Sequence, residues 1–561
     1  MDNFKPDKPS LKAAKGLGAA RAKNVRGQTV SKLREDGQDE HEAVIKKNET
    51  HAEAAQVGAQ LGAQVGKQVV AHLAPIETYA DAQAYLESLT NVEAMKPSRV
   101  DQRAVFTLER MRALVGALEN PERTFRTLHV AGSKGKGSVC EMTAAALAGC
   151  GVTAGVYTSP HLVDIRERIR IGARWISEEA FARCLARVQT AANSLDISLG
   201  NVTHFEALTA AAFVHFADEA VDFAVIEVGM GGLLDATNVI TPTVTAITAI
   251  QLEHTQILGT TLKEIAVHKA GIMKAGVPCI TMGQDKGVME VFRATAERVG
   301  CSLRVLGAEL EFSFRFGKSD EHGGCWRVSV TSPRRAFEHM VVPLKGEPQA
   351  HNLGIALGIV DALAERGVST PEGGVALGLT TTQSSGRMEF VHSSPRIVVD
   401  GAHNPESIGE LVKTLGAHVK YDSLVVVFGC AADKDVTGML AKIATGADKI
   451  IFTRAEGSAR AIDPKELMRK FGEVSTKMAQ VALTVKDALN LAARAVTRGD
   501  LICVTGSFAI AGEAKRALMA KAAGQKTEPK IALQVRSGLT GNVANAAMID
   551  LKPGEAKRSG A

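Results

Sequence analysis

Two series of short apolar runs divide the chain into sheet-forming stretches separated by helical ones. The first series lies at 127–132, 155–159, 223–229, 244–250 and 277–282, and the second at 396–404, 424–435, 449–456 and 501–507. Ala- and Leu-rich stretches of helical period lie between the runs. This alternation predicts α/β architecture with parallel sheets covered by helices. Residues 311–332 instead alternate and are punctuated by glycine, which predicts a small antiparallel insertion.

These patterns predict two α/β domains that join near the Ser-Ser-Gly at 384–386. Residues 79–89 and 106–118 have helical spacing and precede the first series. Residues 1–50 are polar without a period, which predicts disorder, and 51–74 are Gln- and Gly-rich, as in a frayed linker helix. We therefore expect an extension at 1–75, domains at 76–384 and 385–520, and a polar, disordered tail at 521–561.

Composition excludes some classes of function. The net charge of +5 comes from the two ends, since residues 1–50 carry +3 and 521–561 carry +4, which leaves the remainder near −2. With 4% aromatic residues and no basic body, the chain does not resemble a nucleic-acid-binding protein. We also expect no membrane partner, because no run of 18 apolar residues occurs.

The eight cysteines form no C-x-x-C pair or metal-like spacing, as in reduced cytoplasmic proteins. The first residues lack the apolar core of a signal peptide. We therefore expect a cytoplasmic protein, and a monomer.

A glycine-rich turn at 132–138, Gly-Ser-Lys-Gly-Lys-Gly-Ser, lies between a predicted strand and a predicted helix. Such a turn aims backbone N–H groups and a helix N-terminus at an anion, and Lys136 adds a charge for phosphates. The spacing between its glycines is two residues shorter than in the usual phosphate loop, and Gly137 replaces the hydroxyl that binds Mg²⁺. A tight turn without a ligand therefore stays an alternative.

Metal ligands would have to come from other strand ends. Ser159, Glu227 and His254 each follow an apolar run in the first domain. Because the ends of parallel strands converge at one edge of a sheet, these side chains could meet the glycine turn there. For each residue alone, a structural role is the alternative.

Eight segments in a fixed order resemble the folylpolyglutamate synthase and dihydrofolate synthase family of the Mur ligase superfamily. They are HVAGSKGKGS, YTSPHLVDIRERIRI, THFEALT, EVGMGGLLDATNV, EHTQILGTTLKEIAVHKAGIMK, GRMEFV, DGAHNP and GCAADKD, and the likeness spans roughly 80–515. The resemblance implies an N-terminal phosphate-loop ATPase domain with a parallel sheet, followed by a smaller Rossmann-like domain, with the active site between them.

The resemblance also implies roles for particular residues. ATP would lie on Gly132, Ser133, Lys134, Gly135, Lys136, Gly137 and Ser138, with Lys136 facing the terminal phosphates. Ser159, Glu227 and His254 match the magnesium positions, with two Mg²⁺ sites expected and K⁺ as a further candidate cation. Lys269 matches a carbamylated lysine, whose carboxylate-like group suits a hard cation.

The remaining implied positions concern the base, the phosphates and the substrates. Asn352 matches an adenine contact and Arg387 a phosphate contact, while Asp400 and His403 match positions near the nucleotide and the incoming glutamate. Lys136, Lys269 and His403 form the expected catalytic set. The expected substrate positions are Thr203, His204, Phe205, Glu206, Leu234, Asp235 and Ser507.

Several positions depart from the family's usual pattern. Ser133 and Lys134 replace a common Thr-Asn, Leu233 stands where Arg is usual, and Pro348 replaces a His. Ser384 and Ser385 replace Trp-Pro, and Ala509 stands where an aromatic residue is frequent. The implied ATP and metal positions are all present.

The expected reaction is the ATP-dependent joining of L-glutamate to a folate, to dihydropteroate, or to both, through an acyl phosphate. A Mur-type ligase acting on muropeptides is the enzymatic alternative. A catalytically inactive nucleotide-binding regulator is the alternative from another class.

Overall fold

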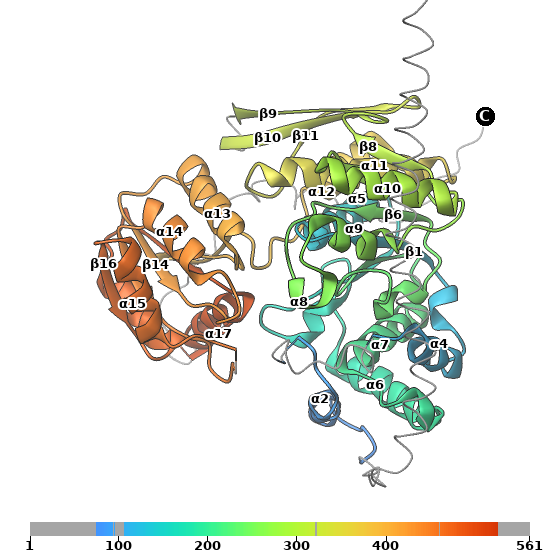
Figure 1. Cartoon of the computed structure of the whole chain (residues 1–561), viewed down its shortest axis with the longest axis horizontal. Coiled ribbons are helices and arrows are strands. Elements are labelled where there is room, and N and C mark those ends of the chain that lie inside the picture. The colour runs from blue at the N-terminus through green and yellow to red at the C-terminus, as the bar shows by residue number, and fades with distance from the viewer. Residues whose placement is uncertain (1–73, 94, 96–105, 320–322, 459, 525–561) are drawn as a thin grey trace, which may run out of the picture. The chain divides into compact units, whose positions relative to one another are not determined.

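The computed structural model describes residues 74–93, 95, 106–319, 323–458 and 460–524 (Figure 1). The predictions made for residues 1–73 and 525–561 lie outside this range. Two large sheets and one small sheet form within a single compact unit that ends at Arg516.

The first sheet has eight strands in the order β4-β3-β2-β5-β1-β6-β7-β8. All neighbours from β2 to β8 are parallel, and the hairpin β3–β4 adds an antiparallel edge. The strands are β1 Arg126–Ala131, β2 Ala154–Tyr157, β3 Ile169–Ile171, β4 Arg174–Trp175, β5 Phe223–Glu227, β6 Val244–Ile247, β7 Cys279–Met282 and β8 Leu303–Leu306.

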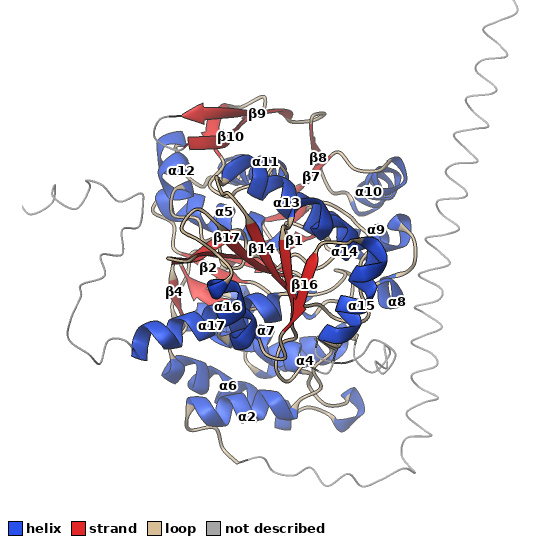
Figure 2. Cartoon of the chain, turned by 90° about the vertical axis from the view of Figure 1, so that its left-hand side faces the viewer, coloured by secondary structure: helices blue, strands red, loops and turns tan. Residues whose placement is uncertain are grey.

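Helices cover both faces of this sheet (Figure 2). On β5, Val225 packs in the core beside α5 and α11, while Ile226 packs in the core beside α6 and α7. Because both faces are buried, β5 is apolar from Phe223 to Ile226 rather than alternating. The helices of this half are α2 Tyr79–Ser88, α4 Leu108–Ala117, α5 Lys136–Gly149, α6 Glu178–Asn193, α7 His204–Asp218, α8 Thr255–Leu258, α9 Leu262–Ala270, α10 Lys286–Val299, α11 Pro348–Ala364 and α12 Glu372–Leu379.

Helices α5 and α12 pack backbone against backbone. A Cβ at Gly149 would lie 2.2 Å from the carbonyl oxygen of Gly374, and one at Gly378 would lie 2.1 Å from that of Ala145. Only glycine fits at such a contact. The helix that begins at the phosphate loop is therefore in direct contact with the last helix before the second half of the chain.

A small antiparallel sheet packs against α11 and comprises β9 Glu311–Ser319, β10 Gly323–Thr331 and β11 Ala336–Val341 (Figure 1). The predicted insertion at 311–332 is therefore confirmed.

The second large sheet has six strands in the order β12-β13-β17-β14-β15-β16, all parallel except β12. Its strands are β12 Glu389–Ser393, β13 Arg396–Val399, β14 Leu424–Phe428, β15 Lys449–Phe452, β16 Met478–Val481 and β17 Leu501–Thr505. The helices of this half are α13 Pro405–His418, α14 Val436–Gly446, α15 Pro464–Val474, α16 Val485–Arg494 and α17 Phe508–Gly524. Residues of α13, α14 and α15 share one core with the strands, and α16 packs against β14 and β15.

The predicted α/β class with two parallel sheets is confirmed, and every apolar run of both series contains a strand. The pattern missed β3, β4, β8, β11, β12 and β16, which are edge or next-to-edge strands of their sheets. Single-turn 3₁₀ helices lie at Pro121–Arg123, Ile165–Arg168, Ile197–Leu199 and Ala236–Val239. No helix in the described residues is long and apolar enough to cross a bilayer. The predicted join at 384/385 falls between α12 and β12 and stays a prediction.

Candidate active site

The glycine loop connects β1 to α5 and is held by its own backbone. The amides of Ser133 and Lys134 both donate to the carbonyl of Ala249, at 2.9 and 3.2 Å, and the Ser133 hydroxyl donates to the carbonyl of Gln251 at 3.0 Å. No side chain caps the start of α5, which follows Gly135. The first N–H groups of this helix are thus free to bind an anion.

Two glycines of the loop have backbone angles and surroundings that exclude a side chain. Gly132 has φ +139°, and its Cβ would lie 1.8 Å from Thr248 Oγ1. Gly135 has φ +94°, and its Cβ would lie 2.3 Å from Asn352 Oδ1. Asn352, the predicted adenine contact on α11, therefore touches the loop, where its amide also donates to Gln349 Oε1 at 2.9 Å.

Gly137, which replaces the usual hydroxyl, leaves room for two charged side chains. A Cβ there would lie 2.4 Å from Arg387 Nη2 and 3.3 Å from Glu227 Oε2. Arg387 follows the predicted join of the two halves. The structure thus brings the predicted phosphate contact and one predicted metal ligand to the first turn of α5, where Ser138 is fully buried.

Lys136 is the lysine of the loop whose ammonium group has no partner among the described residues. Within the described part of the chain it makes no hydrogen bond or ion pair, although its charge acts on the nearby Glu227 and Glu253. A half-buried lysine without a protein partner beside an uncapped helix start is suited to bind phosphate oxygens.

Two of the three predicted metal ligands are in contact. Glu227, at the end of β5, is buried, and its Oε2 accepts a hydrogen bond of 3.1 Å from the backbone N–H of Ser159. Burial raises the pKa of Glu227, against the opposing charges of Lys136 and Arg387. A buried carboxylate of raised pKa gains from a bound cation, and Ser159 offers a neutral oxygen beside it.

The third predicted ligand, His254, stands on a neighbouring loop. It is exposed, precedes the short helix α8 and adopts φ +48°. Throughout the described ranges no three His, Cys, Asp or Glu side chains gather as a ligand set, and the predicted set contains only two residues of these types. A site completed by His254 stays a prediction.

Lys269 on α9 is buried beneath the loop. Its ammonium donates to the carbonyl of Gly132 and to Glu253 Oε1, both at 2.8 Å. Burial lowers the pKa of Lys269 to about 8, and the lysine charges around Glu253 lower the pKa of that carboxyl to about 2 despite its burial. A lysine of depressed pKa carries the neutral amine that reacts with CO₂ near neutral pH, which suits the predicted carbamate.

The second sheet contributes residues from the loop after β13. The Asp400 carboxylate accepts hydrogen bonds of 2.9 Å from the amides of Met388 and Ala402, and burial raises the pKa of Asp400 to about 6. His403 bonds through Nδ1 to the carbonyl of Gly401 at 2.8 Å and through Nε2 to Lys134 Nζ at 2.7 Å. The structure therefore brings His403 to the phosphate loop.

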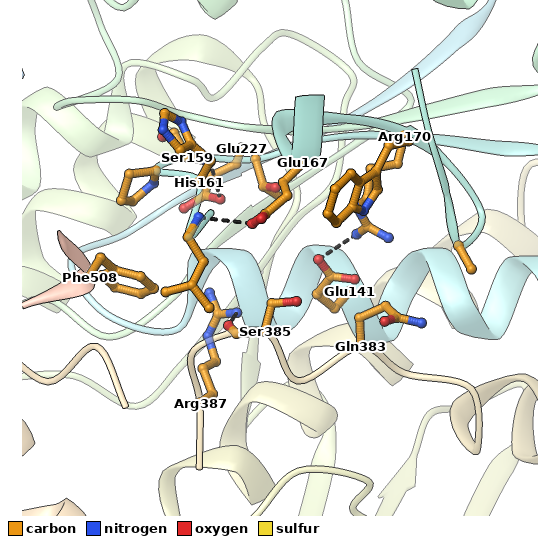
Figure 3. Close-up of a pocket in the computed structure, with 15 residues that line it drawn as sticks. Glu141, Ser159, His161, Glu167, Arg170, Glu227, Gln383, Ser385, Arg387 and Phe508 are labelled. Carbon is orange, nitrogen blue, oxygen red and sulfur yellow. Dashed lines mark hydrogen bonds and ion pairs between the residues drawn. The ribbon is translucent and has the colours of Figure 1, made fainter. Parts of the chain in front are cut away.

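A pocket contains three of the predicted site residues together with residues to which the sequence assigned no role (Figure 3). Ser159, Glu227 and Arg387 line it together with Glu141, His161, Leu162, Glu167, Arg170, Trp175, Gln383, Ser385 and Phe508. Glu141 of α5 pairs with Arg170 of β3. Ala509 stands where the family often has an aromatic residue, and the neighbouring Phe508 supplies an aromatic ring to this pocket.

Several predicted substrate residues are engaged in local structure. Thr203 and Glu206 form the capping box of α7, and Glu206 also accepts hydrogen bonds of 3.0 and 2.8 Å from Arg110 Nε in a buried ion pair. Asp235 accepts from the amides of Met230 and Thr237 at 2.8 and 3.0 Å. These carboxylates are partnered within the protein.

The other predicted substrate residues differ in burial and in their partners. Phe205 packs under Gly229, where a Cβ would lie 2.4 Å from its ring, and Leu234 is half-buried. His204 is buried, and burial together with the charge of Arg168 lowers its pKa to about 4. Ser507 Oγ accepts from the amide of Ile510 at 3.2 Å at the start of α17. Pro348 occupies the first turn of α11, where proline is well tolerated.

Two family models match the chain on either side of the predicted join. Residues 130–360 match the Mur ligase middle domain, and residues 386–508 match the Mur ligase glutamate ligase domain.

The chain is similar to curated and solved proteins over most of their lengths. It is 33% identical to folylpolyglutamate synthase of Lacticaseibacillus casei over 68% of this chain and 87% of that protein. It is also 33% identical to dihydrofolate synthase/folylpolyglutamate synthase of Mycobacterium tuberculosis, over 77% of this chain and 94% of that one. A structure of Escherichia coli FolC in complex with DHPP and ADP aligns with a TM-score of 0.67 at 27% identity, covering 80% of this chain and 99% of that one.

Proposed function

The chain belongs to the folylpolyglutamate synthase and dihydrofolate synthase family of Mur ligases, and from this premise we propose that it joins L-glutamate to a folate-type carboxylate at the expense of ATP. The observation that carries the proposal is the phosphate loop with its uncommitted Lys136, faced by Arg387 and His403 from the second half of the chain.

In this proposal the triphosphate lies on residues 132–138. The uncapped first turn of α5 and Lys136 bind the terminal phosphates, and Arg387 reaches the same turn beside Gly137. Asn352, in contact with Gly135, borders the base. The similar E. coli FolC structure is a complex with ADP, which supports nucleotide binding by this chain.

Ser159 and Glu227 would hold one Mg²⁺, because both residues line one pocket and the Glu227 carboxylate is bound to the Ser159 backbone N–H. His254 and a carbamylated Lys269 would hold a second. Bound Mg²⁺ supplies charge neutralisation at the phosphates during transfer. K⁺ stays a prediction without an assigned residue.

The chemistry has two steps. An oxygen of the substrate carboxylate attacks the γ-phosphorus of ATP, the bond to the β-γ bridging oxygen breaks, and an acyl phosphate and ADP result. The amine of L-glutamate then attacks the acyl carbon, loses a proton and expels inorganic phosphate, which leaves an amide. Lys136 and Arg387 stabilise the charge that develops in the first step.

The second half of the chain would place the amine for the second step. His403 and Asp400 lie on the loop after β13, and Ser507 begins α17. His403 has an acceptor nitrogen that can orient an N–H group, and Phe508 shields the pocket from water, which otherwise hydrolyses an acyl phosphate.

The decisive experiment measures glutamate-dependent ADP release with dihydropteroate, tetrahydrofolate or a nucleotide-linked muropeptide as the acceptor. We expect release with one or both pteroyl substrates and none with the muropeptide. Release with the muropeptide alone would replace the proposal with a cell-wall activity. ATP binding without glutamate-dependent release from any acceptor would leave a regulatory role instead.

A further inference from the structure

A single hydrogen bond links the phosphate loop to the predicted amine-binding histidine. Lys134 Nζ lies 2.7 Å from His403 Nε2, although the two residues are 269 positions apart in the chain. The Lys134 backbone is fixed separately, because its amide donates to the carbonyl of Ala249. The side chain can therefore change partner while the loop keeps its shape.

The partners on either side of the ring fix its proton. The Gly401 carbonyl can only accept, so His403 Nδ1, 2.8 Å away, carries the hydrogen. Nε2 then has the lone pair, and the ammonium of Lys134, which can only donate, bonds to it. Lys134 thus occupies the one acceptor nitrogen of His403.

This pairing is sensitive to the arrival of an anion. Burial and the positive charges of Lys136 and Lys434 lower the pKa of Lys134 to about 8. Burial and the positive charges of Lys134 and Lys434 lower the pKa of His403 to about 3. Glu253 and Glu406 oppose the shift at Lys134. A phosphate oxygen carries charge and accepts a hydrogen bond from an ammonium more strongly than a neutral imidazole does.

We propose that Lys134 is a positioning residue that holds His403 Nε2 until the terminal phosphate of the nucleotide draws the ammonium away and leaves this nitrogen free for the incoming amine. The proposal rests on the proposed function. The nucleotide must then bind before L-glutamate, because the amine can donate to His403 Nε2 only after Lys134 has left it. The amine is thereby kept from the site until an acyl phosphate can form.

The first test follows the imidazole nitrogens of His403 by ¹⁵N NMR in histidine-labelled full-length protein, with the signals assigned by their loss in His403→Gln. In wild type, saturating AMPPCP with Mg²⁺ should shift the Nε2 signal. In Lys134→Met the nucleotide-free signal should already match that of the wild-type complex. Lys434→Met removes a neighbouring charge without touching the bond and should respond as wild type does.

An Nε2 signal that is the same in nucleotide-free wild type and Lys134→Met would overturn the proposal. So would a wild-type signal that does not respond to AMPPCP. Matching melting temperatures of the three proteins show that the comparison is between folded molecules.

The second test measures L-glutamate binding by calorimetry with and without AMPPCP. Wild type should bind glutamate at least about tenfold more tightly in the presence of the nucleotide, and Lys134→Met should lose this dependence. Retention of the wild-type dependence in Lys134→Met contradicts the proposal. If wild type binds no glutamate in either state, the proposal that the nucleotide opens an amine site is wrong, whereas the proposed function fails only if glutamate-dependent ADP release is absent.

Discussion

The phosphate loop and the segments expected to bind the pteroyl substrate differ in how their polar groups are partnered. At the loop, Lys136 has no hydrogen-bonding partner among the described residues, and the first turn of α5 is uncapped. In the substrate segments, Glu206 caps α7 and pairs with Arg110, and Asp235 is bound by backbone amides. Both regions lie within segments that resemble the family's motifs.

This difference indicates which motif residues contact a ligand and which ones stabilise the fold. A ligand that binds a polar group without a partner forms a new interaction and breaks none. A buried carboxylate that is already paired must first lose its partner, which makes binding to a ligand less favourable. We therefore expect substitutions at the loop to affect turnover, and substitutions at Glu206 to affect stability.

The largest effect should follow Lys136→Ala. The loss of this cation should lower glutamate-dependent ADP release by about 10³-fold, because its charge acts on the phosphate that is transferred. The melting temperature should change little, since Lys136 has no protein partner to lose within the described chain. Near-normal turnover would sink the assignment of the loop.

Glu206→Ala should show the opposite pattern. Its removal takes away the carboxylate that pairs with the buried Arg110 and opens the capping box of α7, which should lower the free energy of unfolding by about 3 kcal/mol in urea titrations. The KM for the pteroyl substrate should stay within about threefold. Glu264→Ala removes the carboxylate of the exposed capping box of α9 and should cost only about 1 kcal/mol. A large rise in KM with unchanged stability would show that Glu206 binds substrate.

Gly135→Ala should have an intermediate effect on nucleotide binding. The added Cβ would lie 2.3 Å from Asn352 Oδ1, and the backbone at this position has φ +94°. The loop must therefore distort, at a cost of about 1–3 kcal/mol. Calorimetry should record ATP binding weakened by about ten- to hundredfold. Gly151→Ala is the matched control, because Gly151 has φ +78° but nothing within 4 Å of its Cβ. Equal effects of the two substitutions on ATP affinity would contradict the close packing of Asn352 on the loop.

The smallest effect should be a change of enzyme activity with pH that arises from Lys269. Its pKa is lowered to about 8, so below pH 8 the ammonium form predominates and pairs with Glu253, and above pH 8 the neutral amine can add CO₂. At limiting bicarbonate, activity should therefore rise severalfold as the pH passes through about 8. Saturating bicarbonate should flatten this rise. A rise of the same size at saturating bicarbonate would remove the carbamate from the proposal.

The sequence predicted the elements whose signal is local. Val- and Ile-rich runs identified the central strands, and glycine spacing identified the loop, because each of these signals lies within a few consecutive residues of the sequence. The pocket residues Arg170, Trp175 and Phe508 could not be predicted in this way, since they meet only when β3, β4 and α17 fold against the loop. The structural role of Glu206 likewise depends on Arg110, 96 positions away.

The contact of α5 with α12 has a mechanical consequence. Gly149 and Gly378 let the two backbones touch, so no flexible side chain separates them to absorb a displacement. Helix α5 begins at the loop that would bind phosphate, and α12 leads into residues 380–388, which carry Arg387 back to the first turn of α5. A displacement of α5 would therefore carry α12 with it, and a side chain at Gly149 or Gly378 would force the two helices apart and so shift the segment that bears Arg387.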